Sequence, residues 1–382
     1  ETLIECISAC GVIATLRKAV GMFAFALWDR QERRLTLGRD RFGEKPLYYG
    51  YVDRGDTIAM VFGSELKALR AFEGFDNAVD RSSLALFLRY SYIPAPWSIY
   101  KDVFKIEPGT ILEVTNENVR SRDCKSIAYW SYDEVVAAGL KCPVENVGTA
   151  VDQLERILSD AVSLQLIADV PVGAFLSGGV DSSTIVALMQ ARATRRVKTF
   201  TVGFDDVEFD ESVYARGVAR YLGTEHHEIK VTSKEARDVI PTLARMYDEP
   251  FADSSQIPTS IVCAVARSEV TVALSGDAGD EIFGGYNRYT IGPKLWDNLA
   301  TVPPALRGAI GHAVAAMPDG LWAAFSRFPG LSKPIAPFRS KAYKISSTVA
   351  SINSADDLYR ALVTELSEFD VQVLGAEHLS TR

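Results

Sequence analysis

The sequence predicts two successive folds, an antiparallel α+β block followed by a parallel-sheet α/β domain. Over residues 22–62, short runs of β-forming residues alternate with turn residues, which is typical of hairpins. From residue 150 onward, apolar strand-like runs alternate with helical patterns, which is typical of βαβ units. The length agrees, since 382 residues with 47% hydrophobic side chains can form more than one core.

In the first block, turn sequences such as Asp29-Arg30-Gln31 and Asp53-Arg54-Gly55-Asp56 separate the strand-like runs. The last runs, residues 112–118 and 121–126, lead into a polar stretch. The predicted boundaries are therefore a first domain over 1–126, a connector over 127–149 and a second domain over 150–382.

The second domain is expected to alternate strands with helices along the chain. The expected strands are 172–176, 198–203, 225–231 and 271–274, and the expected helices are 151–168, 181–192, 211–222, 233–247 and 257–267. From Leu295 onward the pattern predicts helices with proline breaks. In a parallel sheet, the loops that follow the strands share one crevice at the carboxyl ends.

Charge and cysteine content restrict the class of protein. With 41 basic and 49 acidic side chains the formal net charge is −8, which repels nucleic acid and anionic membranes. Five cysteines without zinc-type spacing indicate reduced thiols in a cytoplasmic protein. The longest apolar stretch, residues 309–325, is interrupted by Pro318 and Asp319, so no bilayer-spanning segment is expected.

The sharpest motif is a glycine turn, Leu176-Ser177-Gly178-Gly179-Val180-Asp181-Ser182-Ser183, between an apolar strand and a helix. Adjacent glycines let successive N–H groups converge on one point, and the serines add hydroxyl donors, so the turn is suited to phosphate. Asp181 would repel that phosphate unless a divalent cation joined them, which predicts Mg²⁺ with pyrophosphate. The predicted contacts are Ser177, Gly178, Gly179, Asp181, Ser182 and Ser183. The alternative is a plain turn in which Asp181 and Ser182 cap the helix.

An acidic turn, Ser275–Glu281, follows another apolar strand and would share the same crevice. Its three carboxylates repel one another unless some of them bind the same Mg²⁺. Asp280 is the best metal candidate, Asp277 is free to act on a reacting amine, and Glu281 is a candidate substrate contact. The alternative is a solvated acidic turn that caps the next helix.

A third polar segment, Asp248–Ser255, lies between two helical patterns. Its polar groups could orient a small polar substrate, with Asp253 and Ser254 as the candidates. A simple helix cap explains Asp253 to Ser255 almost as well.

These three segments together resemble the synthetase domain of glutamine-hydrolysing asparagine synthetases, which are PP-loop ATP pyrophosphatases. Residues 21–29, 39–49 and 62–65 resemble the latter half of that family's N-terminal-nucleophile glutaminase domain. The resemblance covers nearly the whole chain. It implies a parallel-sheet α/β domain of the adenine-nucleotide α-hydrolase-like kind, preceded by a partial antiparallel α+β glutaminase domain.

The resemblance also implies an ATP-dependent carbon–nitrogen ligase with two sites. One site releases ammonia from glutamine, and at the other ATP adenylates the aspartate side chain before ammonia displaces AMP. By the same resemblance, the adenosine pocket would be lined by Leu176, Val202, Ser275 and Gly276. Asp277 lies where relatives carry an acidic residue near the reactive intermediate.

Parts of the family's architecture fall outside this sequence. By resemblance, the cysteine nucleophile and glutamine-binding segments lie upstream of Glu1, and further substrate-site residues follow Arg382. We therefore expect a fragment that does not hydrolyse glutamine by itself and that need not be active alone. The expected partners are aspartate, glutamine and ATP, without nucleic acid or membrane, and a homodimer stays open. Two other interpretations also stay open. The protein could amidate another carboxylate, such as a sugar acid in surface-polysaccharide synthesis, or the chain could be a non-catalytic fragment.

Two smaller features are interpreted as structural. Cys6 and Cys10 fall in a helix-like segment and are expected to be buried helix residues rather than nucleophiles. His226 and His227 are adjacent in a predicted strand, so one should be buried and the other exposed, and no zinc is expected.

Overall fold

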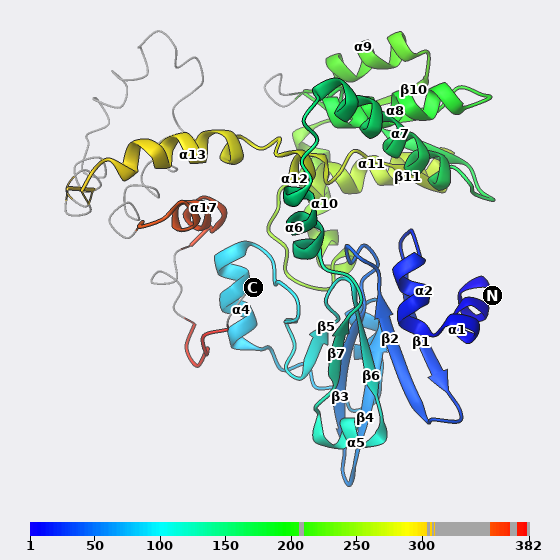
Figure 1. Cartoon of the computed structure of the whole chain (residues 1–382), viewed down its shortest axis with the longest axis vertical. Coiled ribbons are helices and arrows are strands. Elements are labelled where there is room, and N and C mark those ends of the chain that lie inside the picture. Colours follow the sequence, from blue (N-terminus) through cyan, green and yellow to red (C-terminus); the bar gives the residue numbers. More distant parts are fainter. Residues whose placement is uncertain (206–209, 304–305, 308, 310–351, 367–372, 380–382) are drawn as a thin grey trace. The chain divides into compact units, whose positions relative to one another are not determined.

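The computed structural model describes residues 1–205, 210–303, 306–307, 309, 352–366 and 373–379 (Figure 1). Unit 1 comprises Glu1–Leu154, Asp238–Ser254 and Glu368–Arg382, and unit 2 comprises Glu155–Arg237 and Ser255–Ser367. Most of the region expected to hold helices with proline breaks, 310–351, lies outside the described residues, as does most of the apolar stretch 309–325. Within the described ranges, every helix is too short or too polar to cross a membrane.

Unit 1 is built on two antiparallel sheets, with strand orders β1-β2-β6-β7 and β4-β3-β5. The strands are β1 (Ala24–Asp29), β2 (Arg34–Arg39), β3 (Tyr48–Arg54), β4 (Thr57–Gly63), β5 (Val103–Lys105), β6 (Thr110–Val114) and β7 (Lys125–Ala128). The β1–β2 turn is fixed by Asp29, whose Oδ1 accepts hydrogen bonds from the backbone N–H groups of Gln31 and Glu32. The antiparallel prediction for this block is confirmed.

Helices flank the sheets, and some of them pack on the outer faces. They are α1 (Thr2–Cys10), α2 (Val12–Lys18), α3 (Leu66–Arg70), α4 (Arg81–Tyr90), α5 (Asn116–Ser121) and α6 (Tyr132–Lys141). Between the sheets, Leu37 of β2 packs in one cluster with Leu47. Leu16 of α2 packs with Ile111 of β6 on one outer side, and Leu66 of α3 belongs to the core on the other side. The result is four layers held by apolar contacts.

One expectation for unit 1 is wrong. Cys6 and Cys10 are exposed, because α1 turns a different stripe, Leu3 and Ile7, partly inward. All five cysteines of the chain are free thiols. The stretch 127–149, expected as a polar connector, contains the helix α6, which Ser131 caps by accepting a hydrogen bond from the backbone N–H of Glu134.

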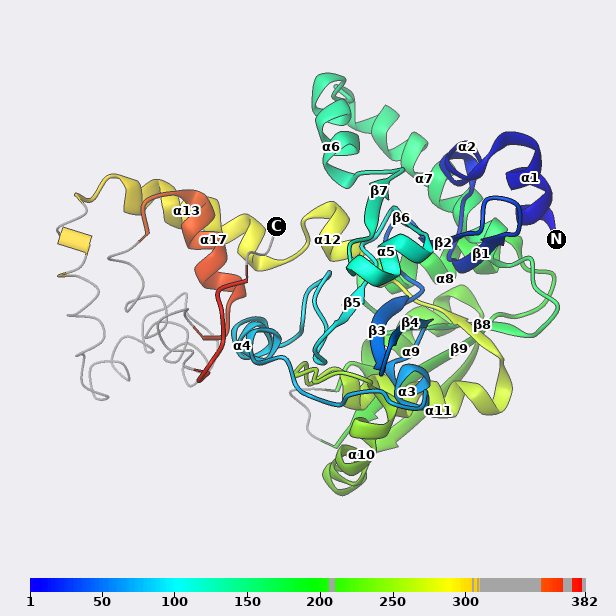
Figure 2. The same cartoon turned by 90° about the horizontal axis from the view of Figure 1, so that it is seen from below.

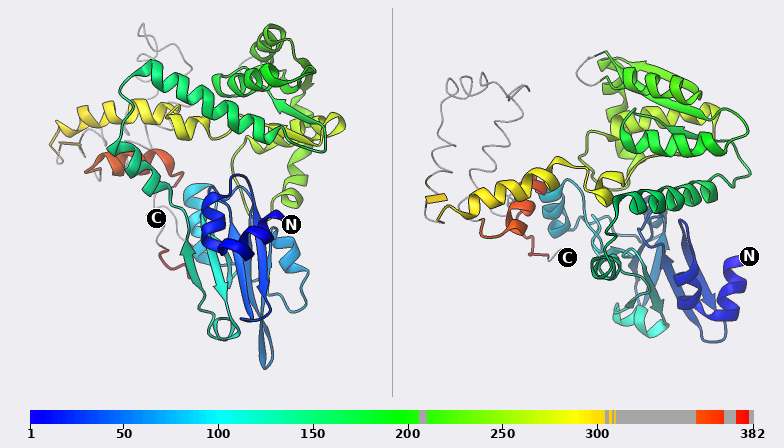
Figure 3. Two further views of the ribbon diagram at one scale, coloured as in Figure 1. Left: turned by 45° about the vertical axis from the view of Figure 1, so that its right-hand side comes forward. Right: turned by 45° about the horizontal axis from the view of Figure 1, so that its top comes forward.

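Unit 2 contains a parallel sheet with strand order β10-β9-β8-β11, which confirms the predicted α/β class. Figure 2 shows its strands and helices, and Figure 3 shows them from two other sides. The strands are β8 (Val172–Phe175), β9 (Lys198–Phe204), β10 (Glu225–Val231) and β11 (Val272–Leu274). The helices are α8 (Val180–Arg192), α9 (Ser212–Leu222), α11 (Gln256–Glu269), α12 (Gly279–Phe283), α13 (Asn287–Ala300) and α17 (Ala355–Val363), while α7 (Val147–Gln165) and α10 (Ser233–Met246) contain residues of both units.

Both faces of the parallel sheet are covered by helices. Val186 of α8 and Ala215 of α9 pack with Ala174 in one cluster, while Ala266 of α11 packs with Phe200 in another. Because β9 and β10 extend the sheet on one side of β8 and β11 on the other, the topology changes direction between β8 and β11. Open α/β sheets bind ligands at the carboxyl ends of strands at such a switch point.

His226 and His227 on β10 are both half-buried, so the expectation of one buried and one exposed histidine is wrong. His226 Nδ1 lies 2.9 Å from Thr199 Oγ1, and the ring of His227 stacks on Phe200 with centroids 5.2 Å apart. Neighbouring side chains of β9 thus cover each of them partly.

Candidate active site

The predicted phosphate turn joins the carboxyl end of β8 to α8. Gly178 has a left-handed φ of 82°, and a Cβ at this position would lie 2.6 Å from the backbone N of Ala215, so the turn requires glycine. The N-cap residue of α8 is Gly179, and no side chain caps the helix. The alternative in which Asp181 and Ser182 cap α8 is therefore not observed. The first N–H groups of α8 remain available to an anion.

Serine hydroxyls hold the turn in shape. Ser182 Oγ lies 2.9 Å from Ser177 Oγ and accepts a hydrogen bond from the backbone N–H of Ser177 at 3.2 Å. Ser177 Oγ accepts from the N–H of Gly179 at 3.2 Å. The hydroxyl of Ser183 is buried and has no hydrogen-bond partner among the described residues. A buried hydroxyl without a partner is unfavourable until a ligand or water pairs with it, so Ser183 is suited to an incoming oxygen.

The acidic turn lies directly against the phosphate turn. A Cβ at Gly276 would lie 2.6 Å from the backbone N of Ser182, and a Cβ at Gly279 would lie 2.6 Å from Asp181 Cγ. Only glycine permits approaches this close. Because Asp280 directly follows Gly279, the structure brings the two predicted metal-binding segments together at the switch point.

Within the part of the chain that the structure describes, no hydrogen-bond donor or cation pairs with the carboxylates of Asp181 and Asp280, and no group of three or more potential metal ligands occurs. Mg²⁺ is usually held by one or two protein carboxylates, with phosphate oxygens and water completing its six ligands. The Asp181 carboxylate lies against the backbone of Gly279 and the Asp280 carboxylate against that of Gly285, so the chemistry of each suits such an ion.

The other acidic candidates have defined partners. Asp277 Oδ2 accepts a hydrogen bond from Ser275 Oγ at 3.0 Å. Glu281 Oε1 accepts from the hydroxyl of Tyr286 at 2.7 Å, and this bond raises the pKa of Tyr286 to about 12. The N-cap of α12 is Ala278, with φ 71° and no side-chain cap, so the acidic turn is not an ordinary helix cap.

The remaining candidates lie in several places. The side chain of Leu176 is packed in the core at 1% exposure, so only its backbone could face adenosine, and Val202 is half-buried on β9. Asp253 and Ser254 belong to unit 1. The helix that follows them, α11, begins after Ser255 without a side-chain cap hydrogen bond, so simple capping does not account for this segment.

The sequence did not reveal two contributors to this region. Gly279 carries no side chain to suggest a role, yet its position against Asp181 requires glycine. The guanidinium of Arg288 lies 3.9 Å from the centroid of the Tyr286 ring and so places a cation beside the partner of Glu281. The only sequence signal for Arg288 is its short distance along the chain from Tyr286.

Both parts of the chain resemble known proteins. Residues 153–377 match the asparagine synthase family, and residues 1–130 match the glutamine amidotransferase domain. Over 290 residues the chain is 35% identical to putative asparagine synthetase (glutamine-hydrolyzing) 2 of Methanocaldococcus jannaschii, covering 75% of this chain and 53% of that protein. Over 308 residues it is 34% identical to asparagine synthetase (glutamine-hydrolyzing) 1 of Bacillus subtilis, covering 80% of this chain and 45% of that protein.

The chain thus spans about half the length of the curated relatives it matches. The parallel sheet and the glycine turn that closes β8 carry the PP-loop ATP pyrophosphatase fold, and the antiparallel sheets of unit 1 lie in the glutamine amidotransferase match. The chain belongs to the asparagine synthase family.

Proposed function

We propose that this chain belongs to a glutamine-dependent asparagine synthetase and carries its ATP-binding site. The observation that supports this most directly is the packing of Gly276 on Ser182 and of Gly279 on Asp181. It sets the acidic turn against the uncapped N-terminus of α8 and against the Asp181 carboxylate, and Asp280 follows directly in the same turn. That combination suits a nucleoside triphosphate with a divalent cation. The free cysteines agree with a reducing compartment such as the cytoplasm.

The proposed reaction solves a chemical problem, since neither oxygen of a carboxylate leaves readily. An oxygen of the aspartate side chain attacks the α-phosphorus of ATP, the bond from that phosphorus to the β-bridging oxygen breaks, and pyrophosphate leaves. Ammonia then attacks the activated carbonyl carbon and loses a proton. The bond to the AMP oxygen breaks with its electron pair, and asparagine and AMP are formed.

The phosphate turn would hold the leaving pyrophosphate. Its donors would be the first N–H groups of α8 and the hydroxyls of Ser177, Ser182 and Ser183, the first two of which are held by their mutual hydrogen bond. Asp181 and Asp280 would hold Mg²⁺, which when bound supplies positive charge that offsets the charge of pyrophosphate.

The other candidates receive roles around the reacting atoms. Asp277, oriented by its bond from Ser275, would accept the proton that ammonia loses. The backbone of Leu176 would line the adenosine pocket with Val202 and Gly276. The acceptor amino acid would be contacted by Asp253, Ser254 and Glu281. The ammonia would come from glutamine, as the match of residues 1–130 suggests for the whole protein.

Exchange of labelled pyrophosphate into ATP tests this proposal in the whole protein to which the chain is proposed to belong. With Mg²⁺ and ATP present, we expect exchange that depends on aspartate. Exchange that depends on a sugar acid such as glucuronate instead would favour amidation of another carboxylate. A chain that binds ATP yet gives no exchange with any carboxylate would support the non-catalytic alternative.

A further inference from the structure

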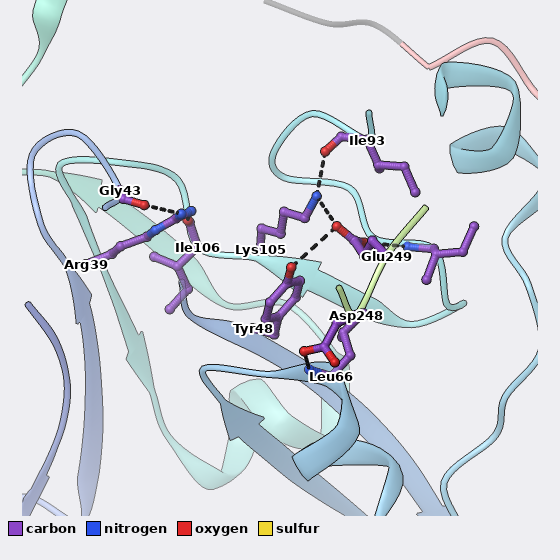
Figure 4. Close-up of polar contacts among 10 residues, drawn as sticks. Arg39, Gly43, Tyr48, Leu66, Ile93, Lys105, Ile106, Asp248 and Glu249 are labelled. Atoms are coloured by element: carbon purple, nitrogen blue, oxygen red, sulfur yellow. Dashed lines mark hydrogen bonds and ion pairs between the residues drawn. The ribbon is translucent and has the colours of Figure 1, made fainter. Parts of the chain in front are cut away.

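One segment of the asparagine synthase match folds as part of unit 1. Residues 238–254 lie inside the match over 153–377, yet they form a compact unit with residues 1–154. Figure 4 shows why, since the side chains of Asp248 and Glu249 lie among polar groups of β3, β5 and the start of α3. Nothing in the proposed reaction uses these two acids.

Both carboxylate oxygens of Glu249 have partners. Oε1 accepts a hydrogen bond from the backbone N–H of Ile99 at 2.9 Å. Oε2 lies 2.5 Å from Lys105 Nζ and accepts a longer bond, 3.4 Å, from the hydroxyl of Tyr48. Lys105 Nζ also donates to the carbonyl oxygen of Ile93 at 2.5 Å. Because the side chains of Lys105 and Glu249 are only 13% and 11% exposed, this ion pair is largely removed from water.

The same segment is held at two more points. Asp248 Oδ2 accepts a hydrogen bond at 2.6 Å from the N–H of Leu66, the first residue of α3, and Asp248 Oδ1 lies 3.2 Å from Lys67 Nζ. The N–H of Ala252 donates to the carbonyl oxygen of Ser91 at 2.9 Å. The Asp248–Leu66 bond joins residues 182 positions apart, so these contacts are tertiary.

Stability alone does not explain a buried pair of charges here. The desolvation of two ions about cancels their attraction, and apolar side chains of similar volume often serve equally well. Burial lowers the pKa of Lys105, which shows the cost of placing its charge in this core. What the pair adds is a defined geometry, because a carboxylate that meets donors on both oxygens fits in one orientation.

We propose that Glu249 is a positioning residue that fixes the segment leading to Asp253 and Ser254. Asp253 directly follows Ala252, whose N–H donates a hydrogen bond to the carbonyl oxygen of Ser91. The backbone of Asp253 therefore has little freedom. Asp253 and Ser254 are the two residues proposed to contact the acceptor amino acid. The part of the inference that concerns substrate rests on the proposed function.

The test compares three variants of the full chain. Glu249→Ala removes all contacts of the carboxylate. Glu249→Gln keeps an acceptor for the N–H of Ile99 and replaces the alanine variant in the test if that variant does not fold. Val114→Ala is the matched control, because it removes buried atoms from unit 1 in a cluster that excludes the segment. Amide hydrogen exchange over residues 248–255 measures how firmly the segment is held and needs no activity.

We expect Glu249→Ala to speed exchange of the Ala252 amide by about tenfold or more, as loss of a charge-assisted anchor predicts, and Val114→Ala to change it much less. No change in Glu249→Ala, or an equal change in Val114→Ala, would overturn the proposal.

Pyrophosphate exchange supplies a second readout. We expect the Glu249 variants to raise the KM for aspartate by about tenfold while the KM for ATP stays constant. An unaltered KM for aspartate, or equal rises in both values, would reject the link to the acceptor. Absence of exchange in the unmodified whole protein would reject the proposed function, and the hydrogen-exchange result would still decide whether Glu249 positions the segment.

Discussion

The carboxylates in the two turns of unit 2 and the carboxylate of Glu249 in unit 1 have opposite surroundings. Glu249 lies in a cluster with Lys105, Tyr48 and the backbone groups of Ile93 and Ile99, which we call the Glu249 cluster. Among the described residues, Asp181 and Asp280 have no partner, and glycine backbones pack closely around them. Glu249 instead has donors on both oxygens, including the cation of Lys105. A carboxylate whose charge is already balanced has little affinity left for an external cation, whereas an unbalanced one has much. The contrast separates acids proposed to bind a cation from an acid proposed to fix the chain.

The largest effect is expected from Asp181→Asn, which keeps the shape of the side chain and removes its charge. If Asp181 holds Mg²⁺ beside pyrophosphate, aspartate-dependent pyrophosphate exchange should fall by at least about a thousandfold, since metal charge stabilisation contributes several kcal/mol. The measurement is the exchange rate at saturating ATP and Mg²⁺.

Asp160→Asn is the matched control, because Asp160 is an exposed acid on α7 of the same unit. Its exchange rate should equal that of the unmodified chain. Full exchange in Asp181→Asn would contradict the proposed metal-binding role of Asp181. It would also contradict the proposed difference between Asp181 and Glu249.

Lys105→Met should give the next largest effect, this time on stability. It leaves Glu249 buried without its cation, and breaking a buried pair from one side costs about 3 kcal/mol in the free energy of unfolding. The double variant Lys105→Met/Glu249→Gln carries no unpaired charge and should recover most of that loss. Urea unfolding monitored by fluorescence measures both values.

Arg122→Gln supplies the comparison for an exposed pair in the same unit. Arg122 pairs with Asp53 and with Asp102, whose side chains are 67% and 56% exposed, so removing both pairs should cost less than about 1 kcal/mol. Equal losses in Lys105→Met and Arg122→Gln would mean that burial of the Glu249 pair has no energetic consequence.

Gly276→Ala should perturb the two turns by a smaller amount. The added methyl group would lie 2.6 Å from the backbone N of Ser182, so the turns must separate, at a cost of about 2 kcal/mol. Exchange activity should fall with it. Gly217→Ala on α9 meets nothing within 4 Å and should stabilise by up to about 1 kcal/mol through helix propensity. An active and fully stable Gly276→Ala would show that the close approach is not needed.

The phosphate turn could be predicted because its signals are local. Gly178 and Gly179 directly follow an apolar strand, and the alternation of strands and helices sets the sheet as parallel. The edge shared with Ser275 follows from that class of sheet. The close packing of Gly279 on Asp181 depends on the pairing of β8 with β11, which no local pattern specifies.

The Glu249 cluster could not be predicted in the same way. Its hydrogen bonds to Ile99 and Tyr48 span 150 and 201 positions, and in the sequence Asp248-Glu249-Pro250 has the composition of an ordinary acidic turn. The exposure of Cys6 was missed for a related reason. In a helix as short as α1, the pattern does not define which stripe faces the core.

His226 extends the comparison to a titratable group whose partner is neutral. Burial lowers the pKa of His226 below its usual 6.5, while the charge of Glu228 acts in the opposite direction. The unfolded chain therefore takes up a proton at His226 at a higher pH than the folded chain does. Between the folded pKa and 6.5 the unfolded state binds more protons, so stability is lost as pH falls through that window and levels off below it.

We expect this smallest effect to appear as a shallower pH dependence of Tm in His226→Gln than in the unmodified chain between about pH 8 and pH 5. The glutamine variant can still bond to Thr199, so a difference in slope reports the proton rather than the hydrogen bond. Identical slopes would mean that His226 binds its proton equally in both states. A steeper slope in the variant would mean that the charge of Glu228 raises the pKa of His226 more than burial lowers it. His226 would then resemble Glu249, whose charge is balanced by its partners.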